Sequence, residues 1–348
     1  HGPDRGGGVA EIERGPGEGA RLRPDATAGR RLQQAEQQQG ELRVDVELVA
    51  LDGPRAAEPL HIVATTGMIA DAVAQVGGDR VEVVSLMGPG VDPHLYRPTA
   101  SDIARMARAD AVFYHGLNLE AQLREFLERL GSRVPVVALA DGLPHERLRE
   151  NPDYANQFDP HVWMDPRLWR GVVIEAADAL SRMDPSGAPT YAANADAYLA
   201  KVDALADYAD RVLSSVPEGA RVLVSAHDAF GYFGASHGFE VLGIQGISTN
   251  SEAGVRQIES LVDTLVSRNI GAIFVESSVS DRNVRALVEG VAARGHAVKI
   301  GGELFSDAMG KPGTYEGFSA NYSGSGFARM NFKFHGLDQA GFDQWSPR

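Results

Sequence analysis

The chain of 348 residues contains no cysteine, which excludes both disulfide bonds and thiolate metal ligands. No stretch reaches the roughly 18 consecutive apolar residues that a membrane-spanning helix needs. The formal net charge of −14 argues against a nucleic-acid partner, because nucleic acids are themselves polyanions. The glycine-rich phosphate loop, the Gly-x-Gly-x-x-Gly fingerprint and the His-Glu-x-x-His motif are also absent from the sequence. Nucleotide chemistry and thiolate chemistry therefore find no support.

The two ends of the chain differ in composition from its middle. Residues 1–58 are rich in Gly, Arg, Gln and Glu and contain no run able to bury a face, so we interpret them as a disordered or non-native leader. Residues 319–348 are dominated by Gly, Ser, Asn and Phe without a persistent helical or strand period, and we expect a divergent, non-native tail. No initiator Met, signal peptide or lipidation Cys is present, so we expect that any export signal of the natural protein has been lost.

Between these ends, strand-like apolar runs alternate with helical patterns. The first block has strand-like runs at 60–66, 81–86, 111–114 and 134–139, with helical patterns at 68–76, 101–109 and 119–130. The second block has strand-like runs at 222–225, 240–244, 272–276 and 297–300. Strict alternation predicts an α/β protein of two lobes, each with a mainly parallel sheet flanked by helices.

An alanine-rich segment separates the two blocks. From 190 to 216 its apolar residues recur at spacings of three and four, which predicts one rigid helix roughly 40 Å long that could join the two lobes. We therefore divide the chain into an N-terminal lobe at 59–185, a connecting helix at 186–216 and a C-terminal lobe at 217–318.

The tripeptide Asp-Pro-His occurs twice, at 92–94 and 159–161, each time on a loop between apolar runs. A third histidine, His227, directly follows a strand-like run, and Asp307 follows another. In an open α/β sheet, ligands bind beyond the carboxyl ends of the strands, so these side chains of both lobes are expected to meet in the cleft between them. Imidazole and carboxylate together suit a borderline divalent ion such as Zn²⁺, and also Mn²⁺ or Fe²⁺.

The residues before each histidine have a mechanical interpretation. Pro93 and Pro160 fix φ and stiffen the loop, while Asp92 and Asp159 can accept a proton from a ring nitrogen or a loop amide. A single Asp-Pro-His would more simply be a turn, because Asp-Pro initiates turns. Two copies together with His227 favour a metal site.

Other polar and aromatic residues receive different interpretations. We expect a loop or cleft-wall role for His115 and structural roles for His61 and His237. Trp163 and Trp169 are expected to pack beside His161. Glu276, at a strand end, either hydrogen-bonds within the cleft or orders a loop. Only one histidine, His145, lies in the 143–157 loop, so no histidine-rich metal-scavenging tract exists there.

Four motifs give the chain a family resemblance. They are Gly-Val-Asp-Pro-His-Leu-Tyr at 90–96, Asp-Pro-His-Val-Trp-Met-Asp at 159–165, Ser-Ala-His-Asp-Ala-Phe-Gly-Tyr-Phe at 225–233 and Phe-Ser-Asp-Ala-Met-Gly at 305–310. Residues 60 to 317 resemble the TroA-like metal-binding receptors of ABC importers. The resemblance implies two lobes bridged by a rigid helix, with one ion bound between them by His94, His161, His227 and Asp307. It further implies delivery of Zn²⁺ or Mn²⁺ to a membrane permease from the periplasm or the outer face of the membrane.

The resemblance also bears on the metal and on the chain ends. Members devoted to manganese tend to carry Glu at the third position, so His227 favours zinc, with manganese next. Members also carry a signal or lipoprotein leader and close with a helix after the Gly-Thr-Tyr motif. Here the leader is absent, and the pattern fails beyond Gly317.

Two classes of function remain open. A receptor would close the coordination sphere with four protein ligands, would not be an enzyme and is expected to be a monomer. A zinc-dependent hydrolase would leave one position open for water, with Asp228 or Glu276 as the base. Substituting Asp307 separates them, because a receptor should lose metal affinity whereas a hydrolase could keep its metal and change its rate. A surface adhesin could coexist with the receptor role.

Overall fold

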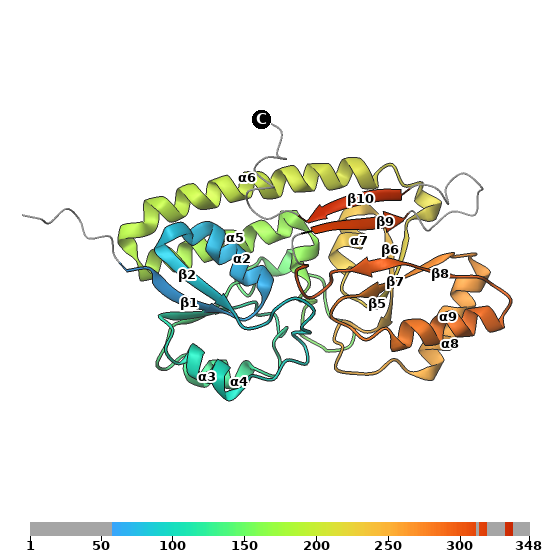
Figure 1. Cartoon of the computed structure of the whole chain (residues 1–348), viewed down its shortest axis with the longest axis horizontal. Helices are drawn as coiled ribbons and strands as arrows, with labels where there is room; N and C mark the ends of the chain where they lie inside the picture. The colour runs from blue at the N-terminus through green and yellow to red at the C-terminus, as the bar shows by residue number, and fades with distance from the viewer. Residues whose placement is uncertain (1–57, 311–312, 319–330, 337–348) are drawn as a thin grey trace, which may run out of the picture. The chain divides into compact units, whose positions relative to one another are not determined.

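The computed structural model describes residues 58–310, 313–318 and 331–336 (Figure 1). The expectations for the leader fall outside the described residues except at Glu58. Those for the tail fall outside them except at 331–336.

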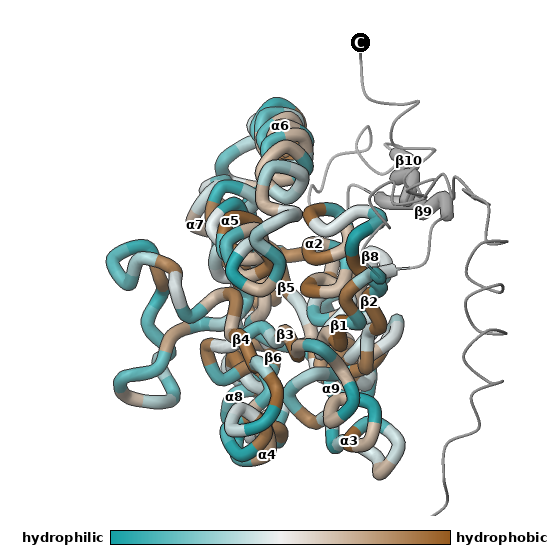
Figure 2. Tube along the Cα trace, turned by 90° about the vertical axis from the view of Figure 1, so that its left-hand side faces the viewer, coloured by the Kyte–Doolittle hydropathy of each residue, from teal (hydrophilic) through white to brown (hydrophobic). Residues whose placement is uncertain are grey.

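The N-terminal lobe is built on a four-stranded sheet in which every pairing is parallel. Its strands are β1 (Leu60–Ala64), β2 (Val81–Ser85), β3 (Ala111–Tyr114) and β4 (Val136–Ala138), in the order β2-β1-β3-β4. Ile62 and Val63 of β1 and Phe113 of β3 are buried, because parallel strands are covered on both faces by their crossover helices. In Figure 2, which colours each residue by hydropathy, hydrophobic residues lie along β1 and β2.

Helices α2 (Gly67–Gly77), α3 (Ala100–Met106), α4 (Arg124–Leu130) and α5 (Pro166–Met183) flank this sheet. Thr66 caps α2 by accepting from the Ile69 amide, and Thr99 with Asp102 forms a capping box at α3. Each cap satisfies backbone donors that a helix start would otherwise leave unpaired.

Helix α4 is shorter than the sequence pattern predicts. The predicted helix at 119–130 begins only at Arg124, and turns occupy the residues before it. Leu117 and Asn118 have φ of 50° and 63°, a conformation that ends regular structure. The buried carboxylate of Glu120 accepts from the backbone amides of His115 and Gly116, which holds this segment as a loop.

The predicted long helix is α6 (Ala188–Leu213), whose 26 residues span roughly 39 Å. Tyr191, Ala195 and Leu199 bury its first half against α2 and α5. In Figure 1 the helix continues over the elements of the C-terminal lobe. Arg170 of α5 pairs with Asp203 of α6 and fixes the two helices side by side.

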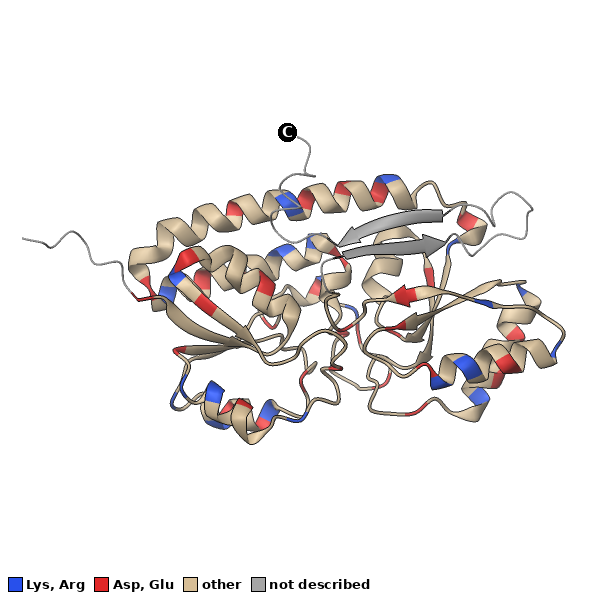
Figure 3. Ribbon diagram, in the orientation of Figure 1, with Lys and Arg blue, Asp and Glu red and all other residues tan. Residues whose placement is uncertain are grey.

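The C-terminal lobe contains two parallel strand pairs. Strand β5 (Val222–His227) pairs with β6 (Glu240–Gln245), β7 (Ala272–Glu276) pairs with β8 (Lys299–Leu304), and β5 lies beside β7. Helices α7 (Gly231–His237), α8 (Val255–Ser267) and α9 (Arg282–Ala293) flank them. The core includes Ile244, Leu265 and Leu287, and charged residues of both signs lie on the outer helices (Figure 3). The α/β fold with two lobes is thus confirmed.

A further strand pair corrects one expectation about the tail. Strand β9 (Gly313–Phe318) pairs antiparallel with β10 (Asn331–Gly336), which lies in the segment expected to lack a strand period. A short period-two signal is present there, since Phe332 and Phe334 alternate with polar residues. Among the helices of the described residues, none is long and apolar enough to cross a bilayer.

Helix α5 offers a matched pair of substitutions that tests the packing of the N-terminal core. Leu180 is fully buried, whereas Ile174 on the same helix is 45% exposed. Leu180→Ala should lower the free energy of unfolding by about 2–5 kcal/mol, and Ile174→Ala by clearly less, because only the buried site leaves a cavity. Denaturant titration of both variants measures the difference, and equal losses would contradict this packing.

Candidate metal centre

The structure brings His94, His161, His227 and Asp307 together. One nitrogen or oxygen atom from each side chain lies within 4.8 Å of the corresponding atoms of the other three. All four residues are buried, with exposed fractions of 0% for His161 and His227, 2% for Asp307 and 4% for His94. Residues far apart in the sequence therefore form one enclosed cluster.

Each lobe supplies two of the four side chains. His227 is the last residue of β5, and Asp307 follows the end of β8, as expected for a site at the carboxyl ends of strands. His94 lies on the loop after β2. His161 lies on the long connection between β4 and α5, directly before the short 3₁₀ turn Val162–Met164.

The distances within the cluster match the edges of a metal-coordination tetrahedron. The Nε2 atom of His161 lies 3.3 Å from Nε2 of His94 and 3.4 Å from Nε2 of His227. The Asp307 carboxylate places Oδ1 3.2 Å from His161 Nε2 and Oδ2 3.2 Å from His227 Nε2. A tetrahedron with metal–ligand bonds of ~2.0–2.1 Å has edges about 1.63 times longer, or ~3.3–3.4 Å. His94 Nε2 lies farther from the carboxylate, 3.9 Å from Asp307 Oδ2, and all four ligand atoms lie within 4.8 Å of one another.

Two buried carboxylates orient two of the imidazoles. Asp159 Oδ1 lies 2.7 Å from His161 Nδ1 and accepts from the His161 amide at 3.0 Å. Glu276 does the same for His227, with Oε2 2.5 Å from Nδ1 and Oε1 accepting from the amide at 2.9 Å. A ring whose Nδ1 donates to a carboxylate presents a lone pair at Nε2 when it is neutral. Both rings therefore aim an acceptor at the centre of the cluster.

The predicted role of the two loop aspartates is confirmed, with a difference between them. Asp159 holds both the ring and the amide of His161, whereas Asp92 accepts from the His94 amide at 2.8 Å. Its second oxygen accepts from the Thr249 hydroxyl at 2.6 Å.

Asp307 places a buried negative charge in the cluster. Among the described residues, neither of its buried oxygens has a hydrogen-bond donor. A buried carboxylate without a partner is unfavourable, because it has lost its hydrogen bonds to water and no protein donor or cation replaces them. Its oxygens face the Nε2 atoms of His161 and His227, so the arrangement requires positive charge at the centre.

Protons can supply that charge when no metal is bound. Burial lowers the pKa of His161, but Asp159 and Asp307 outweigh this effect and raise it to about 9. Burial likewise opposes protonation of His227, yet Asp307 and Glu276 hold its pKa well above the usual value. For His94 burial dominates and lowers the pKa to about 3. Burial disfavours the Asp307 anion, but His227 and His161 hold the pKa of Asp307 well below its usual range.

Hydrogen bonds join the lobes immediately beside the four ligands. Near His94, the Thr249 hydroxyl donates to Asp92 Oδ2 at 2.6 Å. Near His161, the Tyr232 hydroxyl donates to the Asp159 carbonyl at 2.9 Å. Beside Asp307, the Ser306 carbonyl accepts from Trp163 Nε1 at 2.7 Å. The position of one lobe against the other therefore sets the position of the ligands.

The other histidines considered from the sequence lie outside the cluster. His115 is buried outside the cluster, with Nε2 2.7 Å from the Pro160 carbonyl and its ring edge-on to Trp163. It forms part of the wall that holds the His161 loop. His61 is exposed and pairs with Glu82, and His237 lies at the end of α7.

Sequence reasoning left the role of Glu276 open and did not single out Thr249 or Tyr232. The available signal for Glu276 was its place at the end of β7, and for Thr249 its place just after the end of β6. A place at the end of a strand does not reveal which residues of another segment the side chain contacts.

Two parallel α/β lobes that enclose a buried His/Asp cluster define a class of protein, the solute-binding receptors for metal ions. The chain belongs to the family of the periplasmic zinc-uptake complex component A (ZnuA), which it matches over residues 62–325. That family supplies the binding component of an importer and is not a family of enzymes.

Relatives and solved structures agree with this assignment. The chain is 46% identical over 267 residues to the zinc-binding protein TroA of Treponema pallidum (strain Nichols), covering 76% of this chain and 85% of that protein. It is 44% identical over 265 residues to the manganese-binding lipoprotein MntA of Bacillus subtilis (strain 168), covering 76% and 86%. The solved structure of T. pallidum TroA aligns with a TM-score of 0.70 at 43% identity, covering 73% of this chain and 91% of that one. Fe(III)-bound YtgA of Chlamydia trachomatis aligns with a TM-score of 0.65 at 28% identity, covering 72% and 92%.

The opposite pKa shifts of His161 and His94 predict distinct titrations in the metal-free protein. His161 should keep its proton until the pH approaches about 9, and His94 should stay neutral down to about 3. Because folding raises the pKa of His161 above the ~6.5 of an unfolded chain, its stabilisation is complete below that pH and is lost as pH rises towards 9. NMR titration of the imidazole nitrogens tests this, and two ordinary titrations near ~6.5 would contradict it.

Proposed function

We propose that this protein captures one divalent metal ion between its lobes and delivers it to the membrane permease of an ABC importer. The observation that carries the proposal is the enclosed cluster in which three imidazole nitrogens and an unpaired carboxylate face one point. Membership in the zinc-uptake family supports the same function. In this proposal the lobes are residues 59–185 and 217–318, and the segment 186–216 connects them.

We assign the four metal ligands as His94, His161, His227 and Asp307, with zinc as the favoured cargo and manganese next. Relatives named for zinc and for manganese are about equally similar to the chain, so they do not decide between the metals. The donor set favours zinc, because three imidazoles and one carboxylate at tetrahedral spacing suit zinc, whereas manganese prefers more oxygen ligands.

The hydrolase alternative finds no support in the geometry. A catalytic zinc needs an open coordination position, whereas the four side chains assigned here would fill a tetrahedral zinc site. Glu276, one of the two bases considered, is committed to the ring and the amide of His227.

The place of action follows from the same proposal. The family is named for a periplasmic component, and the B. subtilis relative is named a lipoprotein, so we infer an extracytoplasmic protein that works beside the outer face of the membrane. Its direct partner would be the permease subunit, which receives the ion from a monomeric receptor.

Metal binding by the purified chain tests the assignment of ligands. Native mass spectrometry with elemental analysis should show one zinc ion per chain. Asp307→Ala and His227→Ala each remove a residue assigned as a direct ligand. Each should therefore reduce the zinc affinity by more than the roughly 10- to 100-fold that is typical when a residue hydrogen-bonded to a ligand is replaced. His237→Ala, at the end of α7, is the matched control and should bind normally. Unchanged affinity in Asp307→Ala would refute the receptor site.

The carboxylates behind the rings provide a graded test. Glu276→Gln keeps the size of the side chain but weakens the hold on His227 Nδ1, so zinc affinity should fall by roughly 10- to 100-fold. Glu303→Gln, on the neighbouring strand β8, is the control. Competition titration with a chromophoric chelator measures both, and equal affinities would show that Glu276 does not support the ligand.

Metal affinity should also rise with pH. At neutral pH the metal must displace protons from His161 and His227, whose pKa values are raised, to about 9 in the case of His161. Calorimetry in buffers of different ionisation enthalpy should detect proton release on zinc binding. An absence of proton release near neutral pH would contradict the protonated metal-free state.

A further inference from the structure

His94 differs from the other three ligands in its surroundings. It is the most exposed of the four at 4%, and it lines a pocket of about 200 Å³. Both lobes contribute to this pocket, through Leu117 and Ala121 on one side and Ile247 and Ser248 on the other. The pocket therefore opens onto the cluster at His94.

The lining of this pocket is uncharged and mixes apolar side chains with polar ones. It contains carboxamides from three separate segments of the chain, namely Asn118, Gln122, Asn151, Gln157 and Asn250. Among its described lining residues there is no Asp, Glu, Lys or Arg. We call this set the amide vestibule.

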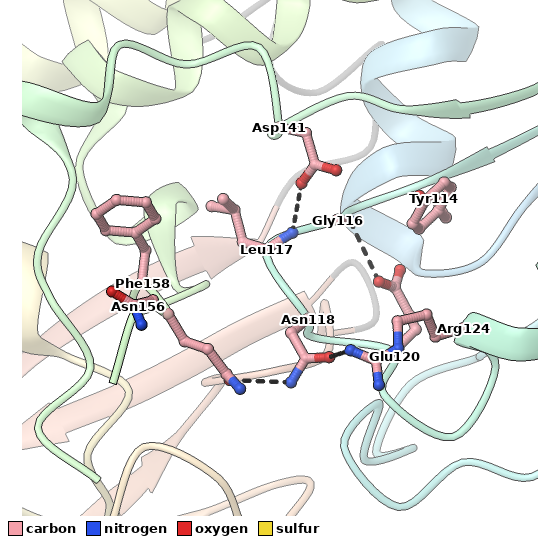
Figure 4. A pocket seen from close by; sticks show the side chains of 10 residues that line it. Tyr114, Gly116, Leu117, Asn118, Glu120, Arg124, Asp141, Asn156 and Phe158 are labelled. Atoms are coloured by element: carbon pink, nitrogen blue, oxygen red, sulfur yellow. Dashed lines mark hydrogen bonds between the residues drawn. The ribbon is translucent and has the colours of Figure 1, made fainter. Parts of the chain in front are cut away.

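Two adjoining pockets have a different character. One, of about 240 Å³, is lined by the charged residues Glu120, Arg124 and Asp141 (Figure 4). The other, of about 280 Å³, is lined by Asp153 and Glu252. Within the described lining of both, none of the four cluster residues occurs, so neither opens onto the metal centre.

The size and chemistry of the amide vestibule suit a hydrated cation. Its volume of about 200 Å³ has room for several water molecules. Carboxamide oxygens can accept hydrogen bonds from metal-bound water without the strong attraction of a carboxylate. A neutral lining therefore holds the ion briefly and does not compete with the buried ligands.

Part of the vestibule is also held in place. Asn118 donates to Gln157 at 3.1 Å. It accepts from Arg124 at 3.3 Å, as Figure 4 shows. Asn118 and Leu117 both have positive φ, a strained conformation for residues other than glycine. These contacts fix the carboxamide of Asn118 at the wall between the charged pocket and the vestibule.

We propose that the amide vestibule is the encounter site for the hydrated divalent ion and the path by which it enters and leaves, with His94 as the first ligand to replace a water molecule. This inference rests on the proposed metal-binding function. It adds a route that the four ligands alone do not define.

A route leaves a kinetic signature distinct from that of a ligand. Narrowing it raises the barrier in both directions, so association and dissociation slow by the same factor while the equilibrium affinity stays constant. Gln122→Trp and Asn250→Trp narrow the vestibule from opposite lobes at exposed positions. Gln257→Trp, exposed in the neighbouring 280 Å³ pocket, is the matched control.

The experiment measures zinc association by stopped flow with a chromophoric chelator, and dissociation by chelator exchange, on the full chain. Both rates should fall by about tenfold in the two vestibule variants and stay unchanged in Gln257→Trp, with the dissociation constant equal throughout. Unchanged rates in both vestibule variants would overturn the route, as would a loss of affinity from faster dissociation alone. Failure of the unsubstituted protein to bind zinc would instead refute the proposed function.

Discussion

Four acceptor atoms buried close together constrain this protein more than any other feature. Three imidazole Nε2 atoms and the Asp307 carboxylate share a volume in which every pair lies within 4.8 Å. Lone pairs at such distances repel one another unless a cation lies between them. Protons on His161 and His227, or one divalent ion, satisfy the same requirement, so metal binding exchanges one form of positive charge for another.

That constraint explains the construction around the ligands. Asp159 and Glu276 turn two rings towards the centre, and each is itself buried. Since each lobe carries two of the four clustered side chains, the short distances between them exist only while the lobes keep this relative position. The hydrogen bonds of Thr249 and Tyr232 cross the boundary at the loops that carry His94 and His161. A small shift between the lobes would therefore move several of these side chains apart at once.

The strands and most helices could be predicted from the sequence, whereas the contacts between segments distant in the sequence could not. Alternating apolar runs predicted the strands; the repeated Asp-Pro-His singled out His94 and His161, and the places of His227 and Asp307 after strand-like runs added the other two residues that converge. The helix at 119–130 was predicted too long, because its apolar spacing does not reveal that Glu120 turns inward to hold a loop. Glu276 stayed open for a related reason, since its role depends on β7 lying beside β5.

The Asp307 carboxylate also explains how one fold can serve more than one metal. Its two oxygens face different imidazoles, Oδ1 towards His161 and Oδ2 towards His227, each at 3.2 Å. A zinc ion would take one of these oxygens, whereas a larger ion that prefers oxygen would take both. His94 and the two oriented rings are common to both arrangements. The loop that carries Ser306 and Asp307 is held from the opposite lobe by the Trp163 hydrogen bond to the Ser306 carbonyl, so its position relative to the three imidazoles depends on that contact.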